Sequence, residues 1–147
     1  SELPSISDWY ILLAFFDNSN KSHEMIKKEL VKNIGIENYS SCIGLFTALS
    51  IHCKSNSVEL LISIFNNSTE SFIRNSIMSS LGFSSSNDSM KFLYSMLLSN
   101  EFRPHILAGI GSARNSKMIP YLKDFLKNNV LTEIDKKQVL EVINHIK

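Results

Sequence analysis

Hydrophobic residues recur at intervals of three and four along almost the whole chain, and strand-like alternation of apolar and polar residues is scarce. This spacing is typical of amphipathic helices. It predicts an all-α protein of about nine helices without strands. The expected helices cover residues 8–17, 22–33, 40–53, 57–66, 70–81, 88–99, 101–110, 117–129 and 132–146.

Several predicted helix ends carry residues that suit those positions. Pro104 and Pro120 fall early in their helices, where a missing N–H costs little. Thr132 is placed to act as an N-cap, because its hydroxyl can accept a hydrogen bond from an unpaired N–H of the first turn. Gly35 follows the second predicted helix and is expected to end it in the left-handed conformation.

The chain repeats itself. An offset of 29 residues aligns 72–97 with 101–126 without a gap, and an offset of 32 aligns 45–65 with 77–97. Matched apolar positions in the first helix of each unit are Leu45/Ile77/Ile106, Phe46/Met78/Leu107 and Leu49/Leu81/Ile110. Those in the second helix, expected to be core, are Val58/Met90/Ile119, Leu61/Leu93/Leu122 and Phe65/Leu97/Leu126.

The repeat predicts the domain organisation. Three helix–turn–helix units cover 41–130, a capping helix pair covers 1–40, and a capping helix covers 131–147, so that residues 1–147 form a single domain. Units of about thirty residues cannot bury their apolar faces alone. We therefore expect them to stack into a right-handed, curved α-solenoid.

Two segments carry a resemblance to a known repeat family. "IRNSIMSSLGFSSSNDSMKFLYSML" and "FRPHILAGIGSARNSKMIPYLKDFL" resemble the short HEAT-like (armadillo-like) repeats also found in phycobilisome-lyase-type proteins. Arg74 and Arg103 match the early arginine of that pattern. The first unit departs from it, with Cys42 and Ser50 at the arginine and glycine positions. The resemblance implies HEAT-like helical hairpins, a fold shared by scaffolds, inhibitors, adaptors and a few enzymes.

Composition adds few constraints. The 147 residues include 15 basic and 14 acidic side chains, and 44% are hydrophobic, as in a soluble globular protein. The net charge of +1 gives no reason to expect an anionic membrane or nucleic acid as partner. Cys42 and Cys53 would lie about 16 Å apart on one helix, too far for a disulfide. Free thiols, and the lack of a signal peptide or of a run of ~18 apolar residues, predict a cytoplasmic protein without a membrane span.

The glycine-rich segment "GIGSARNSK", residues 109–117, suggests a phosphate loop at first sight. Its glycine spacing differs from that of a phosphate-binding loop, and it follows a helix rather than a strand. Gly111 repeats Gly82 and is expected to end a helix, whereas Gly109 repeats Ser80 and indicates a close approach of two helices. The segment is therefore interpreted as a turn between stacked helices.

The chain carries no motif for catalysis, a metal or a cofactor, and none is predicted. The four histidines fall on separate predicted helices, and His23-Glu24 lacks a second histidine four residues on. His52 beside Cys53 is interpreted as a helix-end histidine next to a buried thiol rather than as a catalytic pair, because sequence neighbours on a helix point about 100° apart.

Charged residues are mostly assigned structural or solvated roles. Arg74 and Arg103 are expected to bond carbonyls or acidic groups of the preceding unit, because repeated residues usually share a structural task. Five lysines near the C-terminus could meet phosphates, but acidic residues interrupt them, so nucleic acid is an unlikely partner. These lysines are Lys117, Lys123, Lys127, Lys136 and Lys137.

The second helices of such solenoids line the concave face, and their positions outside the core would meet a partner. These positions form a ridge of charged, aromatic and small polar residues, with Tyr94 as the best anchor. The predicted protein-binding residues are Glu59, Ser63, Lys91, Tyr94, Ser95, Lys123, Asp124 and Lys127.

The sequence therefore predicts a non-enzymatic protein-binding module. Its size, its atypical ends and its Ser-, Asn- and Lys-rich composition resemble the stand-alone α-solenoid immunity proteins of toxin/immunity systems, including those of contact-dependent growth inhibition. The resemblance implies a cognate bacterial toxin as partner, neutralised by blocking its active site. The alternatives are a HEAT-like nucleic-acid-binding or repair protein, and a scaffold or maturation factor. The oligomeric state stays open.

Overall fold

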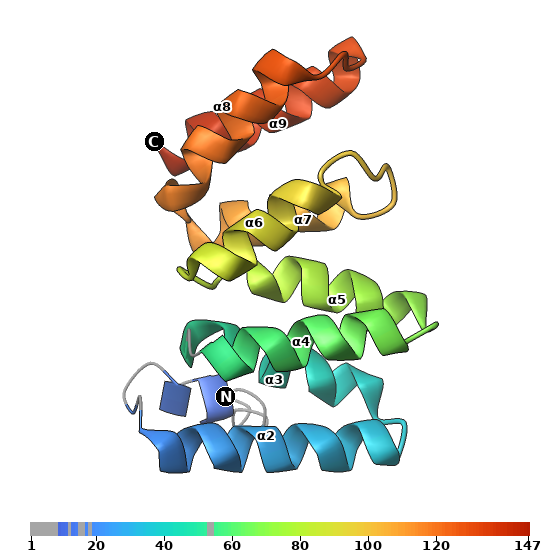
Figure 1. Ribbon diagram of the computed structural model, residues 1–147, viewed down its shortest axis with the longest axis vertical. Coiled ribbons are helices and arrows are strands. Elements are labelled where there is room, and N and C mark those ends of the chain that lie inside the picture. The colour runs from blue at the N-terminus through green and yellow to red at the C-terminus, as the bar shows by residue number, and fades with distance from the viewer. Residues whose placement is uncertain (1–8, 12, 15–16, 18, 53–54) are drawn as a thin grey trace, which may run out of the picture.

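The computed structural model describes residues 9–11, 13–14, 17, 19–52 and 55–147, and regular secondary structure within them is entirely helical. This confirms the all-α prediction (Figure 1). Residues 9–11 and 13–14 are helical and precede α2. The further helices are α2 (Asn20–Gly35), α3 (Tyr39–His52), α4 (Ser55–Asn67), α5 (Ser71–Leu81), α6 (Asn87–Met96), α7 (Arg103–Ala113), the 3₁₀ turn η1 (Ser116–Met118), α8 (Ile119–Asn128) and α9 (Glu133–Ile146).

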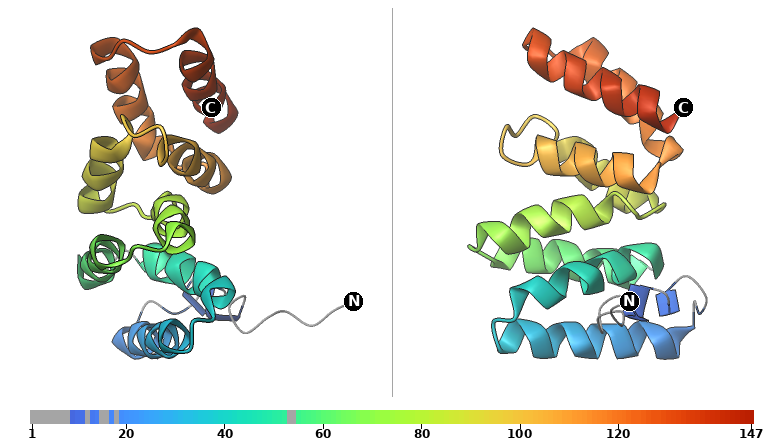
Figure 2. Two further views of the ribbon diagram at one scale, coloured as in Figure 1. Left: turned by 90° about the vertical axis from the view of Figure 1, so that its right-hand side faces the viewer. Right: turned by 180° about the vertical axis from the view of Figure 1, so that it is seen from behind.

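The helices stack along the long axis of the molecule in two layers (Figure 2). In the first layer, α3, α5, α7 and α9 pack against one another in succession, and α2 packs on α3 at one end. The second layer holds α4, α6 and α8, which contact one another less extensively. The turns that lead from α2, α4, α6 and α8 into the following first-layer helix lie along one edge, on the right in Figure 1.

The core follows the repeat with one correction. The nine matched positions of α3, α5 and α7 are all buried, and so are seven of the nine matched positions of α4, α6 and α8. Ile119 and Leu126 were expected in the core but are only half-buried, and Met118 and Phe125 are buried instead. Leu122 stays buried as predicted, so only the first and last of the three positions move back by one residue, and the 3₁₀ turn η1 occupies the point where α8 was expected to begin.

The helix ends agree with the sequence at Thr132, Pro104 and Pro120. The Thr132 hydroxyl accepts a hydrogen bond from the backbone N–H of Asp135 at 3.1 Å, and each proline lies at the start of its helix.

The prediction for Gly35 is wrong. The helix continues through Gly35, and Glu37 takes the left-handed conformation with φ 57°. The N–H groups of Glu37 and Asn38 donate to the carbonyl oxygens of Ile34 and Asn33 at 3.1 and 2.9 Å. These bonds form a Schellman closure, which satisfies the last carbonyls of α2 two residues later than expected.

Candidate functional site

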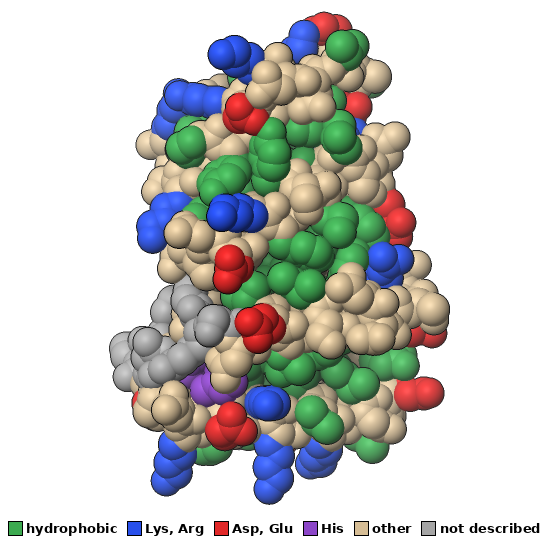
Figure 3. Space-filling model, in the orientation of Figure 1, with side chains coloured by type: hydrophobic (Ala, Val, Ile, Leu, Met, Phe, Trp, Pro, Cys, Tyr) green, Lys and Arg blue, Asp and Glu red, His purple; other side chains and the backbone are tan. Residues whose placement is uncertain are grey.

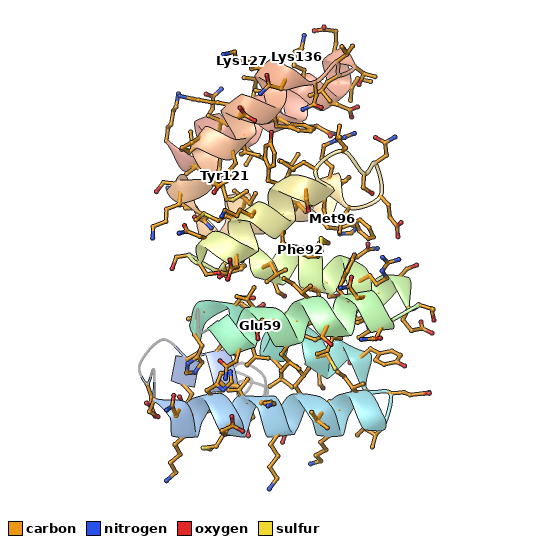
Figure 4. The ribbon with its side chains drawn as sticks, in the orientation of Figure 1. Glu59, Phe92, Met96, Tyr121, Lys127 and Lys136 are labelled. Carbon is orange, nitrogen blue, oxygen red and sulfur yellow. The ribbon has the colours of Figure 1, made fainter. Side chains whose placement is uncertain are left out.

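The predicted ridge lies on one face of the molecule. Its eight residues come from α4, α6 and α8, and all are exposed except Tyr94, which is half-buried. Glu59 on α4 and Lys127 on α8 lie near its two ends (Figure 4). The structure therefore gathers these eight residues on the outer surface of the second layer, which we call the second-layer ridge.

Tyr94 and Asp124 link α6 and α8 within the second-layer ridge. The Tyr94 hydroxyl donates a short hydrogen bond to the Asp124 carboxylate, whose other oxygen accepts from the Asn128 amide at 2.8 Å. The hydrogen bond from Tyr94, followed by that from Asn128, lowers the pKa of Asp124. The same bond raises the pKa of Tyr94. The Tyr121 ring packs on Tyr94 with centroids 5.7 Å apart, so both contacts restrict the movement of the Tyr94 side chain.

A strip of half-buried apolar side chains adjoins the second-layer ridge and was not predicted as part of the site. Figure 3 shows hydrophobic side chains between the charged ones on this face, and Phe92, Met96 and Tyr121 are marked in Figure 4. The signal was in the sequence, because the positions of Leu60, Phe92 and Tyr121 are apolar in every unit. The strip comprises Leu60, Ile64, Phe92, Met96, Tyr121 and Leu126.

Arg74 contacts the preceding unit, but through aromatic rings and not through the carbonyls or acidic groups that the sequence predicted. Its guanidinium carbon lies 4.4 Å from the ring centroid of Phe65 in the preceding unit and 5.2 Å from that of Phe102. The Phe65 ring also meets Phe92 and Phe102 edge-on, at 5.6 and 5.2 Å. The cation thus joins consecutive units through aromatic faces rather than through carbonyls.

Arg103 has the matching task in the next unit and is only 4% exposed. One of its nitrogens donates to the Leu97 carbonyl at 3.0 Å, and the other donates to the Asn100 side chain at 2.6 Å. The same guanidinium pairs with the Asp135 carboxylate of α9 at 3.1 Å. Arg103 therefore joins the end of α6 to the start of α9, which confirms the structural prediction.

The segment "GIGSARNSK" is a helix end and a turn, but its details differ from the prediction. Gly111 does not end α7, which continues to Ala113; Arg114 closes the helix with φ 48° and ψ 45°. The Asn115 side chain donates to the carbonyl oxygens of Gly82 and Ser84 at 2.9 and 3.0 Å. These two bonds attach the α7–α8 turn to the equivalent turn of the preceding unit, between α5 and α6. A cavity of about 240 Å³ lies between the two turns.

Two histidines meet in the core, although they lie on separate helices. The rings of His23 and His52 are buried, with centroids 5.8 Å apart, and Ser22 Oγ lies 3.2 Å from His52 Nε2. His52 is the last residue of α3, as expected, and Cys53 lies outside the described residues. Within the part of the chain that the structure describes, no three His, Cys, Asp or Glu side chains form a group that could hold a metal ion.

The C-terminal lysines differ in their surroundings. Lys136 pairs with Glu133 at 3.4 Å and Lys137 with Glu141 at 3.9 Å, both along α9. The other lysines of this group (Lys117, Lys123 and Lys127) are exposed on η1 and α8. Two of the five lysines are therefore partly neutralised by neighbours on their own helix.

Comparison of the chain with protein-family models, with curated proteins and with solved structures finds no match in any of the three. Among the described residues, no helix has the length and hydrophobicity needed to cross a membrane.

Proposed function

We propose that this chain is a short, right-handed α-solenoid of HEAT-like helical hairpins that works as a non-enzymatic protein-binding module in the cytoplasm. Its resemblance to stand-alone α-solenoid immunity proteins favours a more specific role within that class. In this role it binds a cognate bacterial toxin and blocks the active site of the toxin.

The organised surface of the second layer carries the proposal. The three helices of the second layer present charged side chains beside an apolar strip. The Tyr94–Asp124 hydrogen bond holds an aromatic side chain in a fixed position. Interfaces concentrate their binding energy in such aromatic anchors surrounded by polar groups. Tyr121, packed on Tyr94, extends the anchor onto α8.

The test starts from the protein encoded beside this chain, produced with an inactivating substitution if it is toxic. The two proteins are mixed, and the complex is examined by size-exclusion chromatography with light scattering and by calorimetry. We expect a complex of fixed stoichiometry and inhibition of the toxin at equimolar ratio. Tyr94→Ala is expected to weaken binding about thirtyfold, and Lys137→Ala on exposed α9 serves as the control.

The two alternative functions predict different results. A nucleic-acid-binding protein would retain DNA or RNA in a salt-dependent manner and lose it when Lys117, Lys123 and Lys127 are replaced together. A maturation factor would act in substoichiometric amounts. Repeated failure to find a stoichiometric protein partner would overturn the proposed function.

A further inference from the structure

An apolar pocket opens between two turns at the edge of the stack. It lies where the α2–α3 turn meets the α4–α5 turn and has a volume of about 260 Å³. Its wall is mainly hydrocarbon and aromatic, with two small polar side chains from the end of α4. The lining residues are Ile34, Tyr39, Ile64, Asn67, Ser68 and Ile73. The pocket is smaller than the ~300–1,000 Å³ typical of small-molecule sites, so its size suits one long side chain.

Two glutamates lie two residues along the chain from side chains that line this pocket. Glu37 precedes Tyr39 in the α2–α3 turn, and Glu70 follows Ser68 in the α4–α5 turn. Both glutamates are exposed, and their carboxylates make no hydrogen bond or ion pair with a described residue. Partial burial, with smaller contributions from the charges of Glu37 and Glu70, raises the pKa of Tyr39. The two negative charges therefore act on the wall of the pocket itself.

The same pattern continues along the edge. Glu101 and Glu133 lie in the α6–α7 turn and at the start of α9, so each of the four turns contributes one exposed glutamate. Acidic side chains are visible along this edge in Figure 3. We call these four residues, Glu37, Glu70, Glu101 and Glu133, the acidic edge. Because packed helices lie about 8–10 Å apart, the acidic edge is about 25–30 Å long. Exposed apolar side chains accompany the glutamates, namely Ile36, Phe72, Leu98, Val130 and Ile134.

Several basic residues on the helices that adjoin these turns make contacts of their own. Lys32 lies 4.0 Å from Glu29 on its own helix, and Arg103 is buried against Asp135. Arg74 is held over aromatic rings. At the last turn, Lys136 pairs with the final glutamate of the acidic edge. By contrast, Glu37 and Glu70 beside the pocket have no ion-pair partner among the described residues.

We propose that this pocket receives the side chain of a lysine or arginine from a cationic partner protein, and that the acidic edge contacts the surrounding basic surface of that partner. Lysine and arginine match the site because their apolar stems bury against hydrocarbon while the charged ends stay exposed, here between Glu37 and Glu70. The proposal rests on the protein-binding function above and specifies the charge of the partner.

The site can be tested on the full chain without a known partner. The probe is the n-butylguanidinium ion, which copies the arginine side chain, and n-butylurea is its neutral analogue. Binding is followed by the amide chemical shifts of the protein. We expect n-butylguanidinium to shift amides around Tyr39, Ser68 and Ile73 and to bind at least threefold more tightly than n-butylurea. Added salt should weaken the binding of the cation but not that of the neutral analogue.

Variants then identify the carboxylates responsible. The double variant Glu37→Gln/Glu70→Gln keeps the shape of both side chains and is expected to weaken binding of the cation about threefold to tenfold. The control Asp88→Asn/Glu141→Gln removes the same charge from exposed positions on α6 and α9, outside the pocket and the second-layer ridge, and should change binding less than twofold. Shifts scattered over the surface, equal binding of the neutral analogue, or equal losses in both double variants would each overturn the proposal.

A protein partner, once isolated, provides a second and separate criterion. If the Glu37→Gln/Glu70→Gln variant binds that partner as tightly as the wild type, the pocket proposal fails while the protein-binding function stands. If no stoichiometric partner exists but the cation binds selectively, the protein-binding function fails while the pocket keeps its specificity for a cationic side chain.

Discussion

Gly82 and Gly109 bring the backbones of α5 and α7 into direct contact. A methyl group added to Gly109 would lie 2.0 Å from the carbonyl oxygen of Ser79, and one added to Gly82 would lie 2.5 Å from the carbonyl carbon of Gly109. No side chain fits at either position unless the helices move apart. This confirms the interpretation of Gly109 as the point where two helices approach closely.

Gly109→Ala is expected to lower the free energy of unfolding by about 2 kcal/mol or more, because the added methyl meets backbone rather than a flexible side chain. Gly111→Ala is the matched control two residues along the same helix. A methyl there would have its nearest neighbours at 4.0 Å. It should raise stability by about 0.5–1 kcal/mol, the usual gain of alanine over glycine in a helix.

Urea unfolding followed by far-ultraviolet circular dichroism measures both changes. We predict that the free energy of unfolding falls in Gly109→Ala and rises in Gly111→Ala. Equal effects of the two variants would mean that α5 and α7 are not in backbone contact at Gly109.

Arg103→Met is expected to destabilise the protein by about 3 kcal/mol. The substitution keeps much of the side-chain volume but leaves the Leu97 carbonyl and the Asp135 carboxylate without their buried partner. Lys137→Met is the control, because it breaks an exposed ion pair with Glu141 and should cost less than about 0.5 kcal/mol. Chemical denaturation of both variants compares the two values, and similar costs would contradict a structural role for Arg103.

The repeat predicted most of the buried positions because apolar residues recur at the spacing of a helix face. Positions such as Leu61, Leu93 and Leu122 are fixed by the need of each unit to cover its neighbour, and all three are fully buried. The one-residue shift in α8 could not be predicted in the same way. It concerns Ile119 and Leu126 but not Leu122, and it accompanies η1, whose 3₁₀ geometry reflects local turn hydrogen bonds rather than hydrophobic spacing.

Helix ends and the candidate site were less predictable. The left-handed positions fell on Glu37 and Arg114 rather than on glycine, because the Schellman hydrogen bonds determine which residue takes a positive φ. The pocket between the first two turns is lined by residues from Ile34 to Ile73, and only the tertiary arrangement brings them together. The net charge of +1 gave no indication of the acidic edge, because its four glutamates lie far apart in the sequence.

Arg114→Gly is expected to stabilise the protein by about 0.5 kcal/mol. Arg114 has φ 48° and ψ 45°, a conformation that costs an ordinary residue about 1–2 kcal/mol and costs glycine almost nothing. The greater freedom of glycine in the unfolded chain offsets part of that gain. Lys123→Gly, in the right-handed interior of α8, should instead destabilise by about 1 kcal/mol. Thermal unfolding compares the two, and a lower Tm for Arg114→Gly would refute the prediction.

Tyr94→Phe should raise the pKa of Asp124 toward its ordinary value, because it removes the hydrogen bond that contributes most to the lowered pKa. The Asn128 bond remains, so the return should be incomplete. Ser95→Ala is the control, because the Ser95 hydroxyl donates to the Phe92 carbonyl and has no bond to Asp124. Titration of the Asp124 carboxyl carbon by NMR gives the pKa in each variant; an unchanged value in Tyr94→Phe would rule out the link between α6 and α8.

Stability should fall as the pH rises above the ordinary pKa of the Cys42 thiol. Burial raises the pKa of Cys42 from 9.0 to about 11 in the folded protein. Below pH 9 the Cys42 thiol is protonated in both the folded and the unfolded chain, so its ionisation does not reduce the stability of the protein. Between pH 9 and pH 11 the unfolded chain ionises while the folded chain does not, so about 1.4 kcal/mol per pH unit is lost, or about 2–3 kcal/mol in all. Lysine and tyrosine titrate in the same range, so the measurement is the difference from Cys42→Ala. The unfolding free energy of wild type should fall more steeply with pH than that of Cys42→Ala, and parallel curves would show that the thiol ionises equally easily in both states.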